Sequence, residues 1–412
     1  MRRIILASNR QAIERLASRD EARSPEVERQ AARIVADVRR RGDRALRDWT
    51  RRLDGARVRT LGPADLRRGW TATPPEVRRA LRQAAAHLRK VAERQVPKGF
   101  TVRVAPGLRV EQRVQPLGRV GCYVPGGRYP LPSTLLMTVV PARAAGVRDI
   151  TVVCPRPSPV VLAAALEAGA PSVLAIGGAQ AVAALAYGTE SISRVDKIVG
   201  PGNAWVAAAK ALVSGDCAID FHAGPSEIVV CSDSGRADWI AADLIAQAEH
   251  DPAARAMLVT TRRSLAQAVV DEVRAQLPAE GPARPSIHRN GAIVLASSRA
   301  EATAIVNRLA PEHLVVDEGA NVGAFRAAGT IFVGRWSAQA SGDYATGSNH
   351  VLPTGGAARF RGGLSAADFV RVFSVQTITA RGLRAIGGSV IALAEAEGLR
   401  AHAESVRRRI QP

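Results

Sequence analysis

The sequence predicts an α/β fold in which two parallel-sheet, Rossmann-like units are flanked by helical segments. The first hundred residues carry apolar side chains at three- and four-residue spacing, which is typical of amphipathic helices. From about residue 114, short β-rich runs alternate with helical stretches in two consecutive series, the pattern of parallel sheets with crossover helices. A Gly-Pro segment at 223–226 separates the two series. The two sheets are therefore expected to follow one another along the chain.

The N-terminal region is predicted to contain two long helices, at 26–49 and 75–95. At each start a small polar residue is followed by proline and then by an acidic residue, in Ser24-Pro25-Glu26 and Thr73-Pro74-Pro75-Glu76, which is a common helix start. Gly42 interrupts the first pattern, so we expect a break in the helix there or a close approach of another chain segment.

The remaining elements follow from alternation between apolar runs and helical spacing. The first series has predicted strands at 150–154, 172–176 and 197–199, and predicted helices at 159–168, 179–187 and 204–214. The second series has predicted strands at 227–231, 256–260, 292–296, 313–316 and 330–333. Its predicted helices are 239–249, 264–276, 300–309 and 322–327. Helices around 366–373 and 387–410 complete the chain.

Composition favours a globular, cytoplasmic protein. Its 412 residues are 47% hydrophobic and 23% charged, close to the average for soluble proteins, and no run is long and apolar enough to predict a membrane span. None of the four cysteines form a C-x-x-C pair, which fits a reducing compartment. The net charge of +20 is spread along the chain among acidic residues, so we interpret it as a solvated surface and expect no nucleic-acid partner.

Two glycine-rich segments are candidate cofactor contacts. The sequence from Gly200 to Trp205 follows a predicted strand and opens a helix, so its backbone N–H groups could hold a phosphate. Trp205 stands where the dinucleotide fingerprint has its third glycine, and for this fragment alone an ordinary strand-to-helix turn is the simpler interpretation. The segment from Gly121 to Pro130 could lie against a flat ring through Tyr123, or could simply be a rigid connector.

Polar side chains in the second series suggest metal or acid–base chemistry. Gln247 and His250 lie three apart on a predicted helix, so both can project from one face toward a divalent metal ion; a surface position is the alternative. Glu312 and His313 place a carboxylate beside an imidazole where a helix meets a strand. Since neighbours on a regular strand point to opposite faces, Glu312 is expected in the loop before the strand.

Further candidates lie toward the C-terminus. The segment 341–350 is rich in glycine and polar groups and includes Asp343 and His350. Glu397 and His402 lie on the last predicted helical segment, where a solvated face is the simpler interpretation.

Taken together, these segments closely resemble the histidinol dehydrogenase family. The resemblance covers almost the whole chain in one order, including Val38–Leu46 (VRRRGDRAL) near the start. Its other matching stretches are GRVGCYVPGGRYPLPST at 118–134, GGAQAVAALAYGTE at 177–190, VDKIVGPGNA at 195–204, AGPSE at 223–227, QAEHD at 247–251, PEHL at 311–314, GDYATGSNHVLPT at 342–354 and AEAEGLRAH at 394–402.

The resemblance implies oxidation of L-histidinol to L-histidine through L-histidinaldehyde, in two NAD-dependent steps, with one zinc ion per subunit. It implies zinc ligands at Gln247, His250, Asp343 and His402, and an acid–base pair at Glu312 and His313. The substrate would contact these ligands, His313, and also Ser226, His350 and Glu397. NAD would contact Tyr123, Gln180 and Asn203.

The resemblance also implies two incomplete Rossmann-like domains in an intertwined homodimer, with Glu397 and His402 reaching the partner's active site. The expected zinc-bearing domain comprises 18–121 and 228–364, and the expected NAD-binding domain comprises 122–227. Helical segments at 1–17 and 365–412 complete the division. His222 departs from the apolar residue usual in the family and could be an extra ligand or a packed residue.

The sequence is also compatible with three other functions. A paralogous dehydrogenase could act on another small polar alcohol, such as a sulfonated propanediol. A zinc hydrolase could use Glu312 as its base and would need no nicotinamide. A nucleic-acid-binding protein would show affinity that falls steeply with salt concentration.

Overall fold

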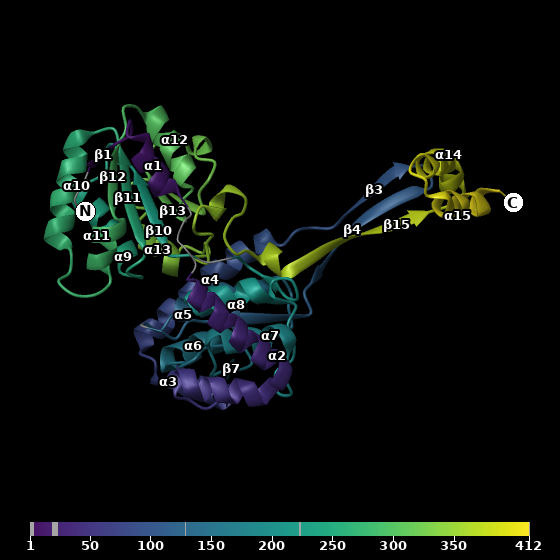
Figure 1. Cartoon of the computed structure of the whole chain (residues 1–412), viewed down its shortest axis with the longest axis horizontal. Helices are drawn as coiled ribbons and strands as arrows, with labels where there is room; N and C mark the ends of the chain where they lie inside the picture. Colours follow the sequence, from purple (N-terminus) through teal and green to yellow (C-terminus); the bar gives the residue numbers. More distant parts are fainter. Residues whose placement is uncertain (1–3, 19–23, 128, 222–223, 412) are drawn as a thin grey trace.

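The chain forms two units, each built around a six-stranded sheet, and a projecting arm (Figure 1). The computed structural model describes residues 4–18, 24–127, 129–221 and 224–411. Within these ranges no helix is both long and apolar enough to cross a lipid bilayer.

The first unit contains a wholly parallel sheet in the order β1-β12-β11-β10-β13-β14. Its central strands β10 and β11 are short apolar runs that are buried on both faces, as is typical of parallel sheets. The strands are β1 Ile4–Leu6, β10 Glu227–Cys231, β11 Arg255–Thr260, β12 Ala292–Leu295, β13 His313–Val316 and β14 Thr330–Val333. The helices are α1 Arg10–Ala17, α9 Ala237–Ala248, α10 Arg263–Gln276, α11 Ala283–Asn290, α12 Arg299–Leu309 and α13 Gln339–Tyr344, with the 3-10 turn η1 Val322–Ala324.

The second unit contains a sheet in the order β2-β7-β6-β5-β8-β9, parallel except for its edge pair β2 and β7. The strands are β2 Thr60–Leu61, β5 Arg119–Tyr123, β6 Asp149–Val153, β7 Val173–Leu174, β8 Lys197–Val199 and β9 Ala218–Ile219. The helices are α2 Pro25–Asp54, α3 Pro63–Ala72, α4 Pro75–Gln95, α5 Pro132–Ala144, α6 Pro159–Glu167, α7 Gly178–Tyr187 and α8 Ala204–Val213.

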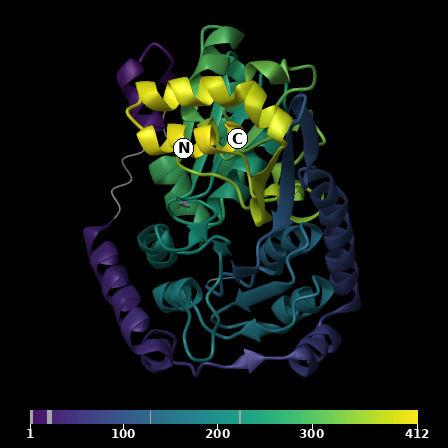
Figure 2. The same cartoon turned by 90° about the vertical axis from the view of Figure 1, so that its right-hand side faces the viewer.

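The arm is a three-stranded antiparallel sheet that carries the C-terminal helices away from both units (Figure 1). Figure 2 views it nearly end-on, with the two helices in front of the first unit. The strands are β3 Phe100–Ala105, β4 Leu108–Pro116 and β15 Val370–Ile378; the helices are α14 Ala380–Ala396 and α15 Arg400–Ile410. The turns η2 Ala357–Arg359 and η3 Ala366–Phe369 lead into the arm.

The alternation of strands and helices in both series is confirmed, and α4 and β13 have the predicted bounds. Three helical predictions differ from the structure. The predicted helix 387–410 is two helices, α14 and α15, with a break at 397–399. Only 322–324 of the predicted helix 322–327 forms, as one 3-10 turn. Residues 370–373 are strand rather than helix, because they pair with β4 and extend the arm.

The division into domains also differs from the sequence prediction. Helices α2, α3 and α4 pack against α7, α6 and α5, and so they belong to the second unit and not with residues 228–364. Residues 351–369 also contribute to the second unit's core, through Val351, Leu364 and Phe369. The N-terminal segment is not separate, since β1 pairs with β12. Sequence periodicity identifies a helix's buried face but not the sheet that it covers.

Gly42 confirms both expectations for its position. It interrupts α2 with φ +54° and ψ −132°, so the helix is kinked there. A Cβ atom at this residue would lie 2.4 Å from the carboxylate Oε2 of Glu190, which accepts a hydrogen bond from the backbone N–H of Asp43 at 2.7 Å. Only glycine combines this backbone conformation with so close an approach.

Candidate active site

A buried carboxylate–imidazole pair lies at the amino end of β13. His313 is the first residue of the strand, and Glu312 lies just outside it, as expected. Glu312 Oε2 accepts hydrogen bonds from Ser226 Oγ at 2.6 Å and from the backbone N–H of Glu227 at 2.9 Å. Because β10 and β13 are adjacent parallel strands, their starts bring Ser226 and Glu312 together.

The His313 ring is oriented by the neighbouring strand. Its Nδ1 lies 3.2 Å from the carbonyl oxygen of Glu227 and 3.6 Å from Glu312 Oε2. Since a carbonyl oxygen only accepts, Nδ1 carries the hydrogen and the lone pair of the neutral ring is on Nε2. That nitrogen lies 3.6 Å from Asp343 Oδ1, and the ring stacks on Phe332 with centroids 6.2 Å apart.

Burial and mutual charge shift the pKa values of this cluster. Burial raises the pKa of Glu312, and the opposing effect of His313 does not cancel it. Burial lowers the pKa of His313, but the carboxylates of Glu312 and Asp343 outweigh it and the net shift is upward. Burial alone would raise the pKa of Asp343, but the hydrogen bond and charge of His313, with smaller contributions from other histidines, outweigh it and the pKa is lowered. Such opposed shifts within one cluster are typical of groups that exchange protons.

Gln247 and Asp343 present oxygen atoms in a way that suits a metal ion. Gln247 Nε2 donates to Ser226 Oγ, while its Oε1 is fully buried and has no hydrogen-bond partner among the described residues. Asp343 Oδ2 accepts from Gln339 Nε2 at 2.8 Å, which fixes the carboxylate. A buried acceptor is seldom left without a donor or a cation to bind it. His250, just beyond α9, is exposed and close enough to Asp343 to lower the pKa of that carboxyl.

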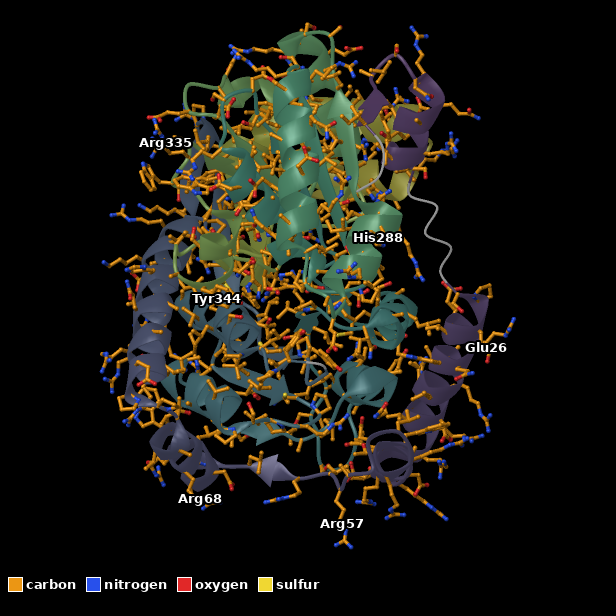
Figure 3. All side chains as sticks on the ribbon, turned by 90° about the vertical axis from the view of Figure 1, so that its left-hand side faces the viewer. Glu26, Arg57, Arg68, His288, Arg335 and Tyr344 are labelled. Atoms are coloured by element: carbon orange, nitrogen blue, oxygen red, sulfur yellow. The ribbon has the colours of Figure 1, made fainter. Side chains whose placement is uncertain are left out.

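His350 links the two units. Its Nδ1 lies 2.9 Å from the carbonyl oxygen of Asp343, and its Nε2 lies 3.1 Å from Thr134 Oγ1 on α5 of the second unit. Asn349 Nδ2 also donates to the carbonyl oxygen of Met137 on α5, at 2.7 Å. Figure 3 labels Tyr344, the last residue of α13, at the level where the two units meet. The segment that carries Asp343, His350 and Asn349 therefore connects the first unit, which contains Glu312 and His313, to helix α5 of the second unit.

Glu397 and His402 do not join this cluster. Both are exposed, at the end of α14 and in α15, and these helices lie at the far end of the arm (Figure 1). Within the described ranges, no group of three or more His, Cys, Asp or Glu side chains is arranged to hold a metal ion. Within one chain, Gln247, His250 and Asp343 therefore lie near one another, whereas His402 lies far from them at the end of the arm. His222 lies outside the described residues.

A cavity of about 640 Å³ lies in the second unit, and all three predicted NAD contacts, Tyr123, Gln180 and Asn203, line it. Tyr123 ends β5 and Asn203 follows β8, so the cavity is at the carboxyl edge of the sheet, where open α/β sheets bind ligands. Tyr123 Oη accepts from the backbone N–H of Gly178 at 3.0 Å, and Asn203 Oδ1 caps α8 through Val206 N at 3.2 Å.

The glycine-rich loop that carries Asn203 is held rigidly. Gly200 has φ +111°, and a Cβ atom there would lie 2.1 Å from the carbonyl oxygen of Tyr123. Lys210 Nζ donates to the carbonyl oxygen of Gly200 at 3.0 Å, and the backbone N–H of Gly200 donates to Asp220 Oδ2 at 2.7 Å. Trp205, in the place of the third glycine, lines the cavity.

The contribution of α2 to this cavity was not predicted from the sequence. The helix supplies eight lining residues, from both sides of its kink: Glu26, Gln30, Arg33, Ile34, Trp49, Arg52, Leu53 and Asp54. No local signal identifies them, because polar and basic residues on a long helix usually face solvent. Gln339 was also missed, although its four-residue spacing from Asp343 on a helix could have indicated their contact.

The buried cysteines have raised thiol pKa values. Burial raises the pKa of Cys122 to about 12 and that of Cys154 to about 11. A thiolate nucleophile at either position is therefore disfavoured.

Fold and site together define a two-unit α/β protein with a ligand cavity at one sheet edge and a buried Glu–His–Asp cluster in the other unit. The model of the histidinol dehydrogenase family matches residues 17–410. The chain belongs to the histidinol dehydrogenase family.

Individual relatives agree over nearly the whole chain. It is 47% identical over 395 residues to histidinol dehydrogenase of Methanothermobacter thermautotrophicus, covering 92% of each chain. It is 44% identical to that of Methylococcus capsulatus, covering 97% of this chain and 95% of the relative. The crystal structure of histidinol dehydrogenase from Elizabethkingia anophelis is similar with a TM-score of 0.94 at 31% identity, covering 99% of this chain and 98% of that one.

Proposed function

We propose that this chain oxidises L-histidinol to L-histidine through L-histidinaldehyde, in two NAD-dependent steps of histidine biosynthesis. Membership of the family supports the substrate. The observation that carries the chemistry is the buried Glu312–His313 pair, whose imidazole presents Nε2 toward Asp343 while Glu227 holds Nδ1. The cavity lined by Tyr123 and Asn203 supports a cofactor in the second unit.

In the first oxidation His313 acts as general base. Its Nε2 accepts the proton of the substrate hydroxyl group while a hydride leaves the carbon atom that bears this hydroxyl, and the product is the aldehyde. Bound NAD supplies the hydride acceptor in both oxidations. The nearby carboxylates of Glu312 and Asp343 stabilise the imidazolium that forms. A base positioned in this way is worth roughly 10²–10⁴ in rate.

In the second oxidation Glu312 activates water. Its pKa is raised by burial, so its carboxylate is a stronger base than a free glutamate. Both hydrogen bonds from Ser226 and Glu227 end on Oε2, which leaves Oε1 to take the proton of a water that adds to the aldehyde carbon. The aldehyde oxygen takes up the proton that His313 gained in the first oxidation, so the diol forms and the imidazole is neutral again. His313 then accepts a proton from one hydroxyl group of the diol while the second hydride leaves the same carbon atom. The products are the acid and two molecules of NADH.

The proposed zinc site uses Gln247, His250 and Asp343 of one chain with His402 of the partner subunit. The orphaned Gln247 Oε1 and the fixed Asp343 carboxylate support it, because both need a cation or donor. Zinc bound there would position the amine and imidazole of histidinol and polarise its hydroxyl oxygen. Ser226 and His350 lie beside these ligands and are the proposed substrate contacts.

A homodimer completes this site. Glu397 and His402 are exposed at the end of an arm, far from the cluster that they would serve in their own chain (Figure 1). The arm also exposes large apolar side chains, including Phe100, Val104 and Leu393, which suits burial against a second copy. Four free cysteines support action in the cytoplasm.

The test is the NADH yield from limiting L-histidinol, with zinc present and histidine quantified. The proposal requires two NADH and one histidine per histidinol. A sulfonated propanediol serves as the control substrate and should give no NADH. Turnover of the diol without turnover of histidinol would refute the proposed substrate.

A further inference from the structure

Asp54 and Gln180 meet in the cavity of the second unit. Asp54 is the last residue of α2, and Gln180 lies in the first turn of α7. Gln180 Nε2 donates to Asp54 Oδ2 at 3.1 Å, so each side chain fixes the other. Both residues line the cavity.

This pair presents acceptors without donors. Gln180 is completely buried, and its Oε1 has no hydrogen-bond partner among the described residues. Asp54 contributes a carboxylate, which only accepts when ionised. Burial raises the pKa of Asp54, while the guanidinium of Arg156 across the same cavity opposes the rise. A ligand that fits must therefore bring hydroxyl or amine hydrogens to this place.

A vicinal diol matches two adjacent acceptors. Its neighbouring hydroxyl groups donate two hydrogen bonds in nearly one direction, and a carboxylate paired with a second acceptor is a common partner of ribose. A phosphate in place of one hydroxyl removes a donor and sets a negative charge beside Asp54. Arg33, Arg52 and Arg156 line the same cavity and suit the pyrophosphate instead.

The location of the cavity selects one ribose of the dinucleotide. The residues that line it include none of Glu312, His313 or Asp343. The nicotinamide ring must lie beside that cluster to accept a hydride from the substrate. The ribose of the nicotinamide half is bonded directly to this ring, so it must lie near the cluster too. The ribose within the cavity is therefore that of the adenosine half.

We propose that Asp54 and Gln180 bind the 2′,3′-diol of the adenosine ribose of NAD, and that Asp54 excludes cofactors with a 2′-phosphate. The inference rests on the proposed NAD dependence, but it assigns a specificity-determining residue that the cofactor contacts predicted from sequence do not include.

The test measures binding of ADP-ribose, which has the diol and undergoes no hydride transfer. Calorimetry without histidinol should show ADP-ribose binding at least 10-fold more tightly than its 2′-phosphate derivative. Asp54→Asn keeps the shape and the bond to Gln180 but loses the charge, so ADP-ribose should bind about 10- to 100-fold more weakly. In Asp54→Asn, the affinities for ADP-ribose and for its 2′-phosphate derivative should differ by less than they do in the unmodified protein. Asp48→Asn is the matched control, since Asp48 is on α2 and outside the cavity lining.

A ligand change tests the same contact in the unmodified protein. 2′-Deoxy-ADP-ribose should bind about 10-fold more weakly than ADP-ribose, whatever the folding of Asp54→Asn. Equal binding of the deoxy ligand, or unchanged affinity in a folded Asp54→Asn protein, would overturn the inference. Because no substrate is present, failure to oxidise histidinol is a separate result that contradicts the proposed function alone.

Discussion

Replacing Lys210 by methionine should destabilise the second unit strongly. Lys210 and Asp220 form an ion pair in which only 3% and 1% of the side chains are exposed. Lys210 Nζ also donates to the carbonyl oxygen of Gly200 at 3.0 Å. Asp220 accepts from the N–H groups of Gly200 at 2.7 Å and Phe221 at 2.6 Å. The pair thus holds the loop that leads to Asn203.

The magnitude follows from what remains buried. Methionine keeps most of the lysine volume, but it leaves the Asp220 carboxylate without its counter-charge. Removing one partner of a buried pair costs about 3–5 kcal/mol. Since two backbone donors still bind Asp220, we expect the lower end, about 3 kcal/mol. Lys210→Met with Asp220→Asn removes both charges and should cost less than the sum of the single changes.

Urea unfolding followed by tryptophan fluorescence measures these differences. Arg236→Met is the control, because the Arg236–Asp238 pair is exposed and should change the unfolding free energy by less than about 1 kcal/mol. If Lys210→Met were as stable as this control, or if the two single changes were additive, the claim that the charges depend on each other in the interior would be wrong.

Three further predictions concern the kink, the metal and pH. Gly42→Ala should lower the unfolding free energy by about 2 kcal/mol, because φ is +54° and Glu190 occupies the Cβ position, whereas Gly388→Ala in open space on α14 should not destabilise; urea midpoints decide. Gln247→Leu should lower the zinc content of purified protein, measured by atomic absorption, while the exposed Gln267→Leu should not; equal content would remove Gln247 from the ligand set. Burial, and then Glu312, raise the pKa of Glu227 from 4.5 to about 7, so its stabilising contribution is complete below pH 4.5 and is lost as pH rises through 7. Glu227→Gln should therefore exceed the native protein in unfolding free energy by about 3 kcal/mol at pH 8, with the difference vanishing near pH 4.5; a constant difference would contradict the shift.

Most of the parallel strands were predictable because each is a short apolar run between helical periods. β13 and α4 show this, since both begin and end at the predicted residues. The central strand β5 was not predicted, because its glycine-containing residues were interpreted as part of the loop segment 121–130. The arm was not predictable in the same way. β3 and β15 both pair with β4, and the paired residues of β15 and β4 are more than 250 positions apart in the sequence. Nothing in the local sequence of Val370–Ile378 predicts that β4 is its partner.

The candidate site divides in the same manner. Ser226 and Glu312 come together because the adjacent parallel strands β10 and β13 begin at one edge of the sheet. Asp343 reaches His313 because the segment after β14, which includes α13, returns to that edge. Asp54 could not be assigned from the sequence, because its role depends on a kinked helix packing over the other sheet. His402 remains a prediction, since one chain does not bring it to Gln247.

The NADH yield of Glu312→Gln tests the central claim most directly. The unmodified protein should give two NADH per limiting L-histidinol, whereas the variant should stop near one, with the aldehyde trapped by a hydrazine reagent. The half-buried Glu272 lies on α10, outside the Glu312–His313–Asp343 cluster, so Glu272→Gln is the matched control and should give two. A yield of two from Glu312→Gln, reached at a rate equally reduced in both oxidations, would contradict the assignment of water activation to Glu312.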